Sequence, residues 1–220
     1  MLNKIRILLR RLIHFMSSDL DSIFDKKNLI SSKNVDYVTS IYELFKKTRQ
    51  VPGHIFEFGV GNGRNSIIFG KMIKNHNLTS IKKYFGFDFF DKKESPLSID
   101  LNLANDLMIS NGIKEETNFI KGDLKLSLET FLKSNHGFRE GMLLISLIYI
   151  DLNKYEVSKY ALNKLKNFIS KGAIIAVDES KTADDTKALR EFCEENKLIF
   201  KSGDFGPHIS SYTIFDKEQN

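Results

Sequence analysis

From residue 54 onward, short apolar runs alternate with longer stretches in which apolar residues recur every three or four positions. The first pattern predicts buried strands and the second predicts amphipathic helices. The predicted strands cover residues 54–60, 84–88, 118–121, 143–151, 173–178, 199–202 and 210–215. The predicted helices between them cover residues 65–75, 101–111, 127–134, 156–170 and 183–196. Strand and helix therefore alternate along most of the chain.

This alternation predicts an open α/β sheet with right-handed crossovers and helices on both faces, a three-layer Rossmann-like arrangement. Residues 143–151 form a nearly continuous apolar run, as expected of a central parallel strand that is buried on both faces. The last two strands are separated only by residues 203–209, with Gly-Asp-Phe-Gly-Pro at 203–207, which is too short for a crossover and favours an antiparallel hairpin. We therefore expect seven strands, mostly parallel, with an antiparallel last strand.

The chain before residue 51 has a different pattern, so we divide it into an N-terminal helical segment, 1–50, and a domain, 51–220. Residues 3–16 carry leucines and isoleucines at helical spacing with lysines and arginines among them, which predicts a basic amphipathic helix. It is too short and too often interrupted by arginine to span a membrane, and it does not resemble a signal peptide. It packs on the domain or on a second subunit, or it anchors the protein on anionic lipid. A second helix is predicted over residues 35–47.

The net charge of +5 is confined to the N-terminal segment. Residues 1–50 hold ten of the 33 Lys and Arg and five of the 28 Asp and Glu, so residues 51–220 hold 23 of each sign. A neutral domain lacks the basic surface on which nucleic-acid binders depend. We therefore expect a small-molecule partner and no nucleic acid.

Cysteine usage limits the compartment and the kinds of site. Cys193 is the single cysteine, which excludes an internal disulfide framework and a cysteine-rich zinc site. It falls on a helix pattern far from the glycine motif, so we interpret it as an inert structural thiol. This usage fits a cytoplasmic protein.

The most informative motif lies where the first strand ends. Glu57 closes the strand, and Gly59, Gly61 and Gly63 follow it immediately before a helix. A sharp strand-to-helix turn needs residues without a Cβ, both for positive φ and to let a ligand approach the backbone. The spacing is Gly-x-Gly-x-Gly and departs from the dinucleotide fingerprint. Glu57 is predicted to bind a cationic or hydroxylated part of this ligand. Together with this acid, the glycine spacing indicates S-adenosylmethionine as the cofactor, and a nicotinamide oxidoreductase is disfavoured.

The next four strand ends also carry an acid, at the edge where open α/β sheets bind ligands. Asp88 lies just over 20 residues beyond the glycines, where an acid accepts hydrogen bonds from ribose hydroxyls. Asp123 follows the third strand and is predicted to hold the adenine amino group. Asp151 ends the fourth strand and is predicted to contact the cofactor as well.

Three acids at the fourth and fifth strand ends indicate a second function for this edge. Asp151, Asp178 and Glu179 come from adjacent strands, and converging carboxylates either bind a hard cation or share protons. Mg²⁺ accepts such ligands and lowers the pKa of a bound hydroxyl. His208 precedes the last strand, and a neutral histidine is a suitable base near pH 7. We take Asp151 and His208 as the candidate catalytic residues.

Residues 57–63, 85–90, 149–156 and 171–179 resemble class I S-adenosylmethionine-dependent methyltransferases, and more narrowly the macrocin O-methyltransferase family of sugar O-methyltransferases. The similarity covers about residues 50–195. It implies a methyltransferase fold with a seven-stranded sheet, and a metal held by the acids to which Asp151, Asp178 and Glu179 correspond. The chain has Asn153 where the family often has an aspartate, and Asp-Glu in place of Asp-Asp, and these remain oxygen ligands.

The resemblance implies methyl transfer from S-adenosylmethionine to a hydroxyl of a sugar or glycosylated metabolite, with or without assistance from Mg²⁺. Two alternatives stay open. One is metal-independent methylation of a nitrogen or a carboxylate. The other is a non-catalytic cofactor-binding protein that residues 1–16 tether as a subunit of a membrane-associated complex.

Overall fold

The computed structural model describes residues 32–94, 98–134, 143–178 and 184–216. The predicted helix over residues 3–16 and the candidate ligand Glu179 lie outside these residues. The chain divides into two compact units between residues 39 and 40, inside helix α2 (Ser32–Thr48), and the description below concerns the unit that begins at Ser40. The division between residues 50 and 51 stays a prediction.

The core of this unit is a six-stranded sheet in the order β3-β2-β1-β4-β5-β6. All neighbouring strands are parallel except β5 and β6, which are antiparallel. The strands are β1 (His54–Phe58), β2 (Tyr84–Asp88), β3 (Thr117–Lys121), β4 (Ile145–Ile150), β5 (Ile169–Asp178) and β6 (Ile209–Phe215). The order reverses between β1 and β4, and such a switch point is where open α/β sheets bind ligands.

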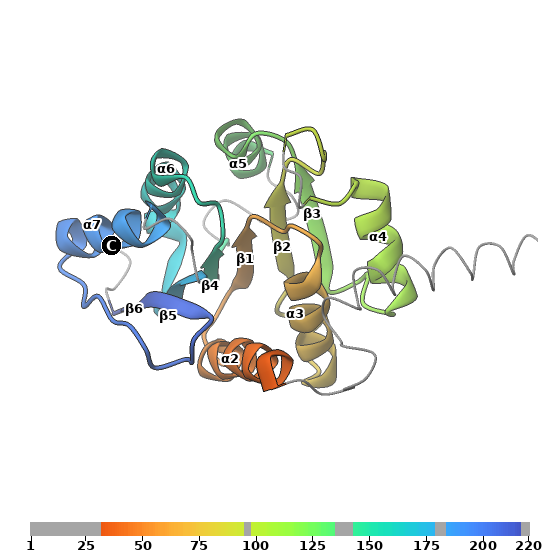
Figure 1. Cartoon of the computed structure of the whole chain (residues 1–220), viewed down its shortest axis with the longest axis horizontal. Helices are drawn as coiled ribbons and strands as arrows, with labels where there is room; N and C mark the ends of the chain where they lie inside the picture. Colours follow the sequence, from red (N-terminus) through yellow and green to blue (C-terminus); the bar gives the residue numbers. More distant parts are fainter. Residues whose placement is uncertain (1–31, 95–97, 135–142, 179–183, 217–220) are drawn as a thin grey trace, which may run out of the picture. The chain divides into compact units, whose positions relative to one another are not determined.

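Helices cover both faces of the sheet (Figure 1). The connecting helices are α3 (Arg64–Asn75), α4 (Leu101–Ser110), α5 (Leu124–Lys133), α6 (Tyr155–Leu165) and α7 (Asp184–Asn196), and a 3₁₀ turn (Lys166–Phe168) follows α6. The main core cluster joins one face of the sheet to α5, α6 and α7. On the opposite face Phe69 of α3 stacks on Tyr84, and Phe90 and Phe119 pack beside α4.

Strand faces alternate as expected, so neighbouring residues of β1 have opposite environments. Phe56 and Phe58 point into the aromatic cluster with Phe87 and Phe131. Between them Glu57 points to the α3 face, where it hydrogen-bonds to Tyr84.

The predicted three-layer, mostly parallel α/β fold is confirmed, and the strand count is corrected from seven to six within the described residues. Residues 199–202 make only an isolated bridge, between Lys201 and Tyr212, because the chain turns away at once toward Gly203. Ile199, an apolar residue on which the predicted strand rested, is 69% exposed and so is not part of a buried strand. In addition, β5 begins at Ile169, where the sequence pattern predicted the end of a helix.

None of the helices in the described part of the chain has both the length and the apolar content needed to cross a lipid bilayer.

Candidate active site

The turn after β1 is made of glycines in the left-handed region, with φ of +91° at Gly59, +56° at Gly61 and +83° at Gly63. The N–H of Gly59 donates to the carbonyl of Phe87, which holds the turn against the end of β2. A Cβ at Gly59 would lie 2.0 Å from the carbonyl oxygen of Asp151. Gly63 is the N-cap of α3. The backbone of the turn thus requires these glycines independently of any ligand.

Asp88, at the end of β2, ties this turn to the following loop. Its Oδ2 accepts the N–H of Gly61 at 3.0 Å, and its Oδ1 accepts the N–H of Phe90 at 3.1 Å. The hydroxyl of Ser98 also donates to Oδ1. Asp88 is only half-buried, so its carboxylate can still accept donors from the cavity side.

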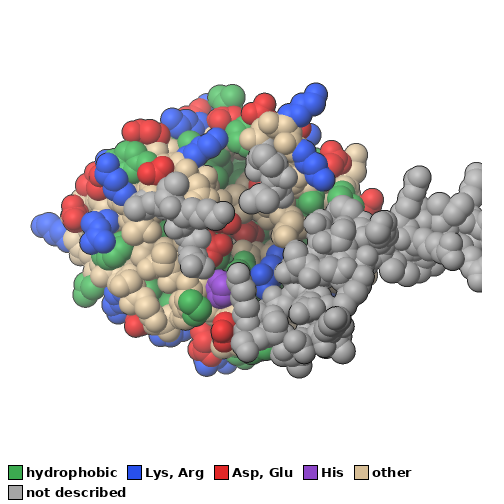
Figure 2. Space-filling view, in the orientation of Figure 1, with side chains coloured by type: hydrophobic (Ala, Val, Ile, Leu, Met, Phe, Trp, Pro, Cys, Tyr) green, Lys and Arg blue, Asp and Glu red, His purple; other side chains and the backbone are tan. Residues whose placement is uncertain are grey.

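A cavity of about 240 Å³ opens at the carboxyl edge, where β1 to β4 end. Five predicted residues, Gly59, Gly61, Asp88, Asp123 and Asp151, line it, whereas Gly63 does not. Its other lining residues are Phe87, Phe89, Glu94, Gly122, Leu124, Leu152, Asn153, Lys154 and Val157. In the space-filling view, acidic side chains gather in a hollow near the middle of the visible face (Figure 2). Residues from four strand ends therefore meet around one cavity.

Asp123 has a structural role besides its place at the cavity. Its side chain caps α5, because Oδ1 accepts the N–H groups of Lys125 at 3.0 Å and Leu126 at 3.3 Å. The helix consequently begins at Leu124, earlier than the apolar pattern predicted. The other carboxylate oxygen is the one left to a ligand.

Glu57 does not line the cavity. It is 1% exposed, and its carboxyl accepts the Tyr84 hydroxyl and the Asn65 amide, the latter at 2.9 Å. Burial raises the pKa of Glu57 to about 8, against the opposite effect of these two hydrogen bonds, and the nearby charges of Asp151 and Asp178 add to the increase. Glu57 is therefore a structural element that joins β1 to β2 and α3.

Asp151 and Asp178 lie together, as the sequence predicted for the ends of β4 and β5. Burial, then the charge of Asp178, then that of Asp185, raise the pKa of Asp151 to about 7. His208 is 8% exposed and precedes Ile209, whose backbone pairs with Asp178 across β5 and β6. Acid and histidine thus share this part of the edge, although His208 does not line the cavity.

A hard cation would relieve the repulsion between these carboxylates, so the donor chemistry suits Mg²⁺. Within the described ranges, however, no three His, Cys, Asp or Glu side chains are grouped closely enough to hold a metal ion. The structure supplies Asp151 and Asp178, and the third predicted ligand, Glu179, lies outside the described residues.

Sequence reasoning missed several residues of this site. Lys154 lines the cavity, and its ammonium lies 5.5 Å from the centre of the Phe89 ring. Phe89 itself is one of the three phenylalanines around Asp88, of which the sequence pattern predicts one in the core and another at the adenine pocket. Glu94 is a further acid of the lining. Asp185 is fully buried behind the loop after β4. In the sequence its position in the first turn of a helix indicates only a favourable helix dipole, so nothing predicted this contact.

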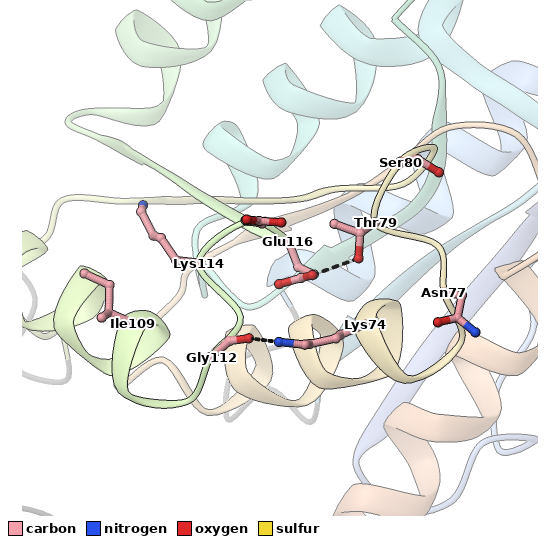
Figure 3. Close-up of a pocket in the computed structure, with 9 residues that line it drawn as sticks. Lys74, Asn77, Thr79, Ser80, Ile109, Gly112, Lys114 and Glu116 are labelled. Carbon is pink, nitrogen blue, oxygen red and sulfur yellow. Dashed lines mark hydrogen bonds between the residues drawn. The ribbon is translucent and has the colours of Figure 1, made fainter.

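A second cavity, of about 640 Å³, lies at the opposite edge, beside the residues that precede β2 and β3 (Figure 3). Its polar groups are bonded to one another: Lys74 donates to the Gly112 carbonyl at 2.5 Å, and Thr79 to the Glu116 carboxylate at 2.8 Å. Lys114 donates to Asn105 at 2.7 Å. These contacts fasten the end of α4 to its neighbours, and none of the predicted site residues lines this second cavity.

No protein-family model matches the sequence, and no curated protein is significantly similar to it. Solved structures are similar in fold. The crystal structure of the calicheamicin methyltransferase CalS11 has a TM-score of 0.72 at 18% identity, covering 86% of this chain and 82% of CalS11. The apo structure of CalS11, described as a TDP-rhamnose 3'-O-methyltransferase, gives 0.66 at 21% identity with the same coverage. The O-methyltransferase NovP gives 0.69 at 16% identity, covering 83% of this chain and 81% of NovP. The chain therefore has the fold of class I S-adenosylmethionine-dependent methyltransferases.

Proposed function

We propose that this chain is an S-adenosylmethionine-dependent methyltransferase that methylates a hydroxyl group of a small molecule. The observation that carries this proposal is the cavity at the carboxyl edge, where the glycine turn, Asp88 and Asp123 line one space. A nucleoside needs three features of its site: backbone without a Cβ, an acid that accepts hydrogen bonds from the ribose hydroxyls, and a second acid for the base.

Each of these residues has a chemical task in the proposed complex. Gly61, with φ of +56°, lets the ligand approach the backbone. Asp88 accepts the ribose hydroxyls while its bonds to Gly61 and Phe90 keep it oriented. Asp123 accepts the adenine amino group through the oxygen that does not cap α5.

S-adenosylmethionine supplies a methyl group that its sulfonium already activates. The protein therefore contributes mainly proximity and orientation of the acceptor hydroxyl. Asp151 and His208 are the proposed acceptors of the hydroxyl proton. Asp151 suits this task, since a pKa of about 7 matches a base that works near neutral pH.

The finer parts of the proposal concern the acceptor and the metal. A sugar or glycosylated metabolite is the proposed acceptor, and the activity ascribed to CalS11, a TDP-rhamnose 3'-O-methyltransferase, agrees with it. Asp151, Asp178 and Glu179 would hold Mg²⁺, which would stabilise the deprotonated hydroxyl. We further propose a cytoplasmic location, and contact of residues 1–16 with a membrane surface or a second copy of the chain.

Calorimetric titration of the full chain with S-adenosylhomocysteine tests cofactor binding. We expect saturable one-to-one binding, which Asp88→Asn weakens by about tenfold because a ribose hydrogen bond to a charged acceptor is lost. Asp91→Asn, on the same loop, is exposed and does not line the cavity, so this control should bind normally. Binding of NAD⁺ in place of S-adenosylhomocysteine would overturn the cofactor assignment.

Transfer of a labelled methyl group to a panel of sugars and nucleotide sugars tests the reaction, with and without chelator. Turnover that survives chelation, on amines or carboxylates only, would favour the metal-independent alternative. Cofactor binding without turnover, together with liposome sedimentation that depends on residues 1–16, would favour the non-catalytic tethered subunit.

A further inference from the structure

Asp185, in the first turn of α7, is a fully buried carboxylate that accepts hydrogen bonds from four donors. Its Oδ2 accepts the N–H of Leu152 at 2.9 Å and the N–H of Asn153 at 2.7 Å. Its Oδ1 accepts the N–H of Lys154 at 3.3 Å and the hydroxyl of Ser158 at 2.6 Å. One side chain thus binds three successive backbone N–H groups of the loop between β4 and α6.

This loop has a conformation that needs such an acceptor. Asn153 adopts a φ of +55°, and a turn of this kind directs consecutive N–H groups to one point. These groups directly precede α6, where backbone donors have no partner within the helix and the helix dipole favours a negative charge. A buried carboxylate at this point satisfies the donors and fixes the turn.

The other side of the same loop is a wall of the cavity. Leu152, Asn153 and Lys154 all line the cavity, next to Asp151, whereas Asp185 does not. The loop therefore separates the buried carboxylate from the space that a ligand would fill. Any change in the loop backbone would move the wall.

We propose that Asp185 is a positioning residue: it holds the loop after β4 in the shape that makes the cavity fit its ligand, without touching that ligand. The inference rests on the proposed function only in naming S-adenosylhomocysteine as the probe. Asp185 belongs to α7, so the following α/β unit of the fold would set the geometry of the binding site.

Hydrogen exchange in the full chain tests the positioning without any ligand. We expect slow exchange of the Leu152, Asn153 and Lys154 amides in the wild type, although the Asn153 and Lys154 side chains are exposed. Asp185→Asn should speed this exchange at least about tenfold, because an amide cannot accept from all the donors. Exchange of these amides in the wild type at the rate of an unstructured peptide would overturn the proposal, even if the variant does not fold.

Titration with S-adenosylhomocysteine then tests the effect on the cavity. Asp185→Asn should weaken binding about tenfold, a loss of the size expected for disturbed hydrogen bonds to a charged group. Ser158→Ala removes a donor from the same buried carboxylate without affecting the loop N–H groups, so it should lower the melting temperature but not the affinity. Asp184→Asn changes the neighbouring, half-buried charge and should bind normally.

The two hypotheses fail differently in these measurements. A wild type that does not bind S-adenosylhomocysteine contradicts the proposed cofactor, and the exchange data still decide whether Asp185 positions the loop. A folded Asp185→Asn variant with wild-type exchange, or with wild-type affinity, contradicts the positioning role. Equal losses of affinity in Asp185→Asn and Ser158→Ala would also contradict it, because they would reflect stability alone.

Discussion

At the scale of single residues, Gly59 lies where the backbone after β1 closely approaches the backbone after β4. Its N–H binds the end of β2, and the carbonyl of Asp151, after β4, occupies the space where a Cβ would be. Two requirements therefore act at one position: a φ of +91° and the absence of a side chain. The glycine keeps the turn directly beside Asp151, which lines the cavity.

Gly59→Ala should destabilise the protein by about 3 kcal/mol or more, since a left-handed backbone and an overlap with a carbonyl both cost free energy. Gly203→Ala is the matched control, because Gly203 has a φ of +89° but no atom within 4 Å of an added Cβ. It should cost only about 1–2 kcal/mol. Urea unfolding of both variants measures the difference. Equal losses of unfolding free energy would show that the overlap with the Asp151 carbonyl does not affect stability.

Glu57 makes the stability of the protein depend on pH. Burial raises its pKa to about 8 from an ordinary value of 4.5, so between these values the folded chain holds a proton that the unfolded chain releases. The free energy of unfolding therefore falls as pH rises through this window, by at most about 1.4 kcal/mol per pH unit from this group.

Glu57→Gln cannot ionise and should lose this slope. Relative to the wild type, the variant should be more stable at about pH 8 than at about pH 5, as measured by urea unfolding at both values. Glu94→Gln, at an exposed position of the cavity lining, serves as a control with the same change of charge. A difference between Glu57→Gln and wild type that is constant with pH would mean that Glu57 is ionised in the folded protein.

The residues also show what the sequence could predict about the site. The strand-end rule located Gly59, Gly61, Asp88, Asp123 and Asp151 around one cavity. The same rule assigned Glu57 to the cofactor, whereas the structure buries its side chain between the sheet and α3. The rule gives the position of a residue along its strand but not the face of the sheet to which its side chain points. The rule says nothing about Asp185, which reaches the site from another helix.

At the scale of elements, a buried lysine holds the entrance to β1. Lys82 is 2% exposed, and its ammonium donates to the carbonyls of Val51 and Gly53 and to the hydroxyl of Ser146. These contacts join the connection before β1, the start of β2 and the start of β4. They lie at the opposite edge from the cavity, so they secure the sheet on which the site depends.

Lys82→Met should lower the free energy of unfolding by about 2–3 kcal/mol, because three hydrogen bonds to a buried charged group are lost. Lys83→Met is the control: Lys83 makes one exposed bond, to the carbonyl of Glu115, and its loss should cost less than about 1 kcal/mol. Denaturant unfolding gives the free energy of unfolding of both variants, which carry the same substitution at neighbouring positions. Similar losses would show that burial of Lys82 is unimportant.

Element boundaries depended on details that apolar periodicity does not contain. Helix α5 begins earlier than predicted because Asp123 caps it, and residues 199–202 make one bridge where a strand was expected. The antiparallel last strand is confirmed, but it pairs with β5, whereas the short connection before it predicted a hairpin with residues 199–202. Type and order of elements follow from local pattern, whereas their ends follow from caps and neighbours.

At the scale of the whole molecule, the sheet order brings acids from distant parts of the sequence to one edge. Asp151 and Asp178 end adjacent strands, and each disfavours the charge of the other. Natural sites accept such repulsion where a cation or a reaction uses it. The fold therefore carries a stability cost at this edge, and removing one charge should reveal it.

Asp178→Asn should raise the melting temperature at about pH 8, where Asp151 is largely ionised, by about 2–4 °C for each 1 kcal/mol of repulsion relieved. The same substitution should abolish turnover and leave the affinity for S-adenosylhomocysteine nearly unchanged, since Asp178 does not line the cavity. Scanning calorimetry and the methyl-transfer assay on one preparation measure both effects.

Magnesium should reverse the order of stability in this comparison. A cation that binds only the folded state stabilises it, so Mg²⁺ should raise the melting temperature of the wild type toward or above that of Asp178→Asn and leave the variant unchanged. Asp184→Asn, a half-buried position in the first turn of α7, should respond to Mg²⁺ as the wild type does. If Mg²⁺ shifts none of the three proteins, Asp151 and Asp178 bind no metal, and a base must act on the acceptor hydroxyl alone.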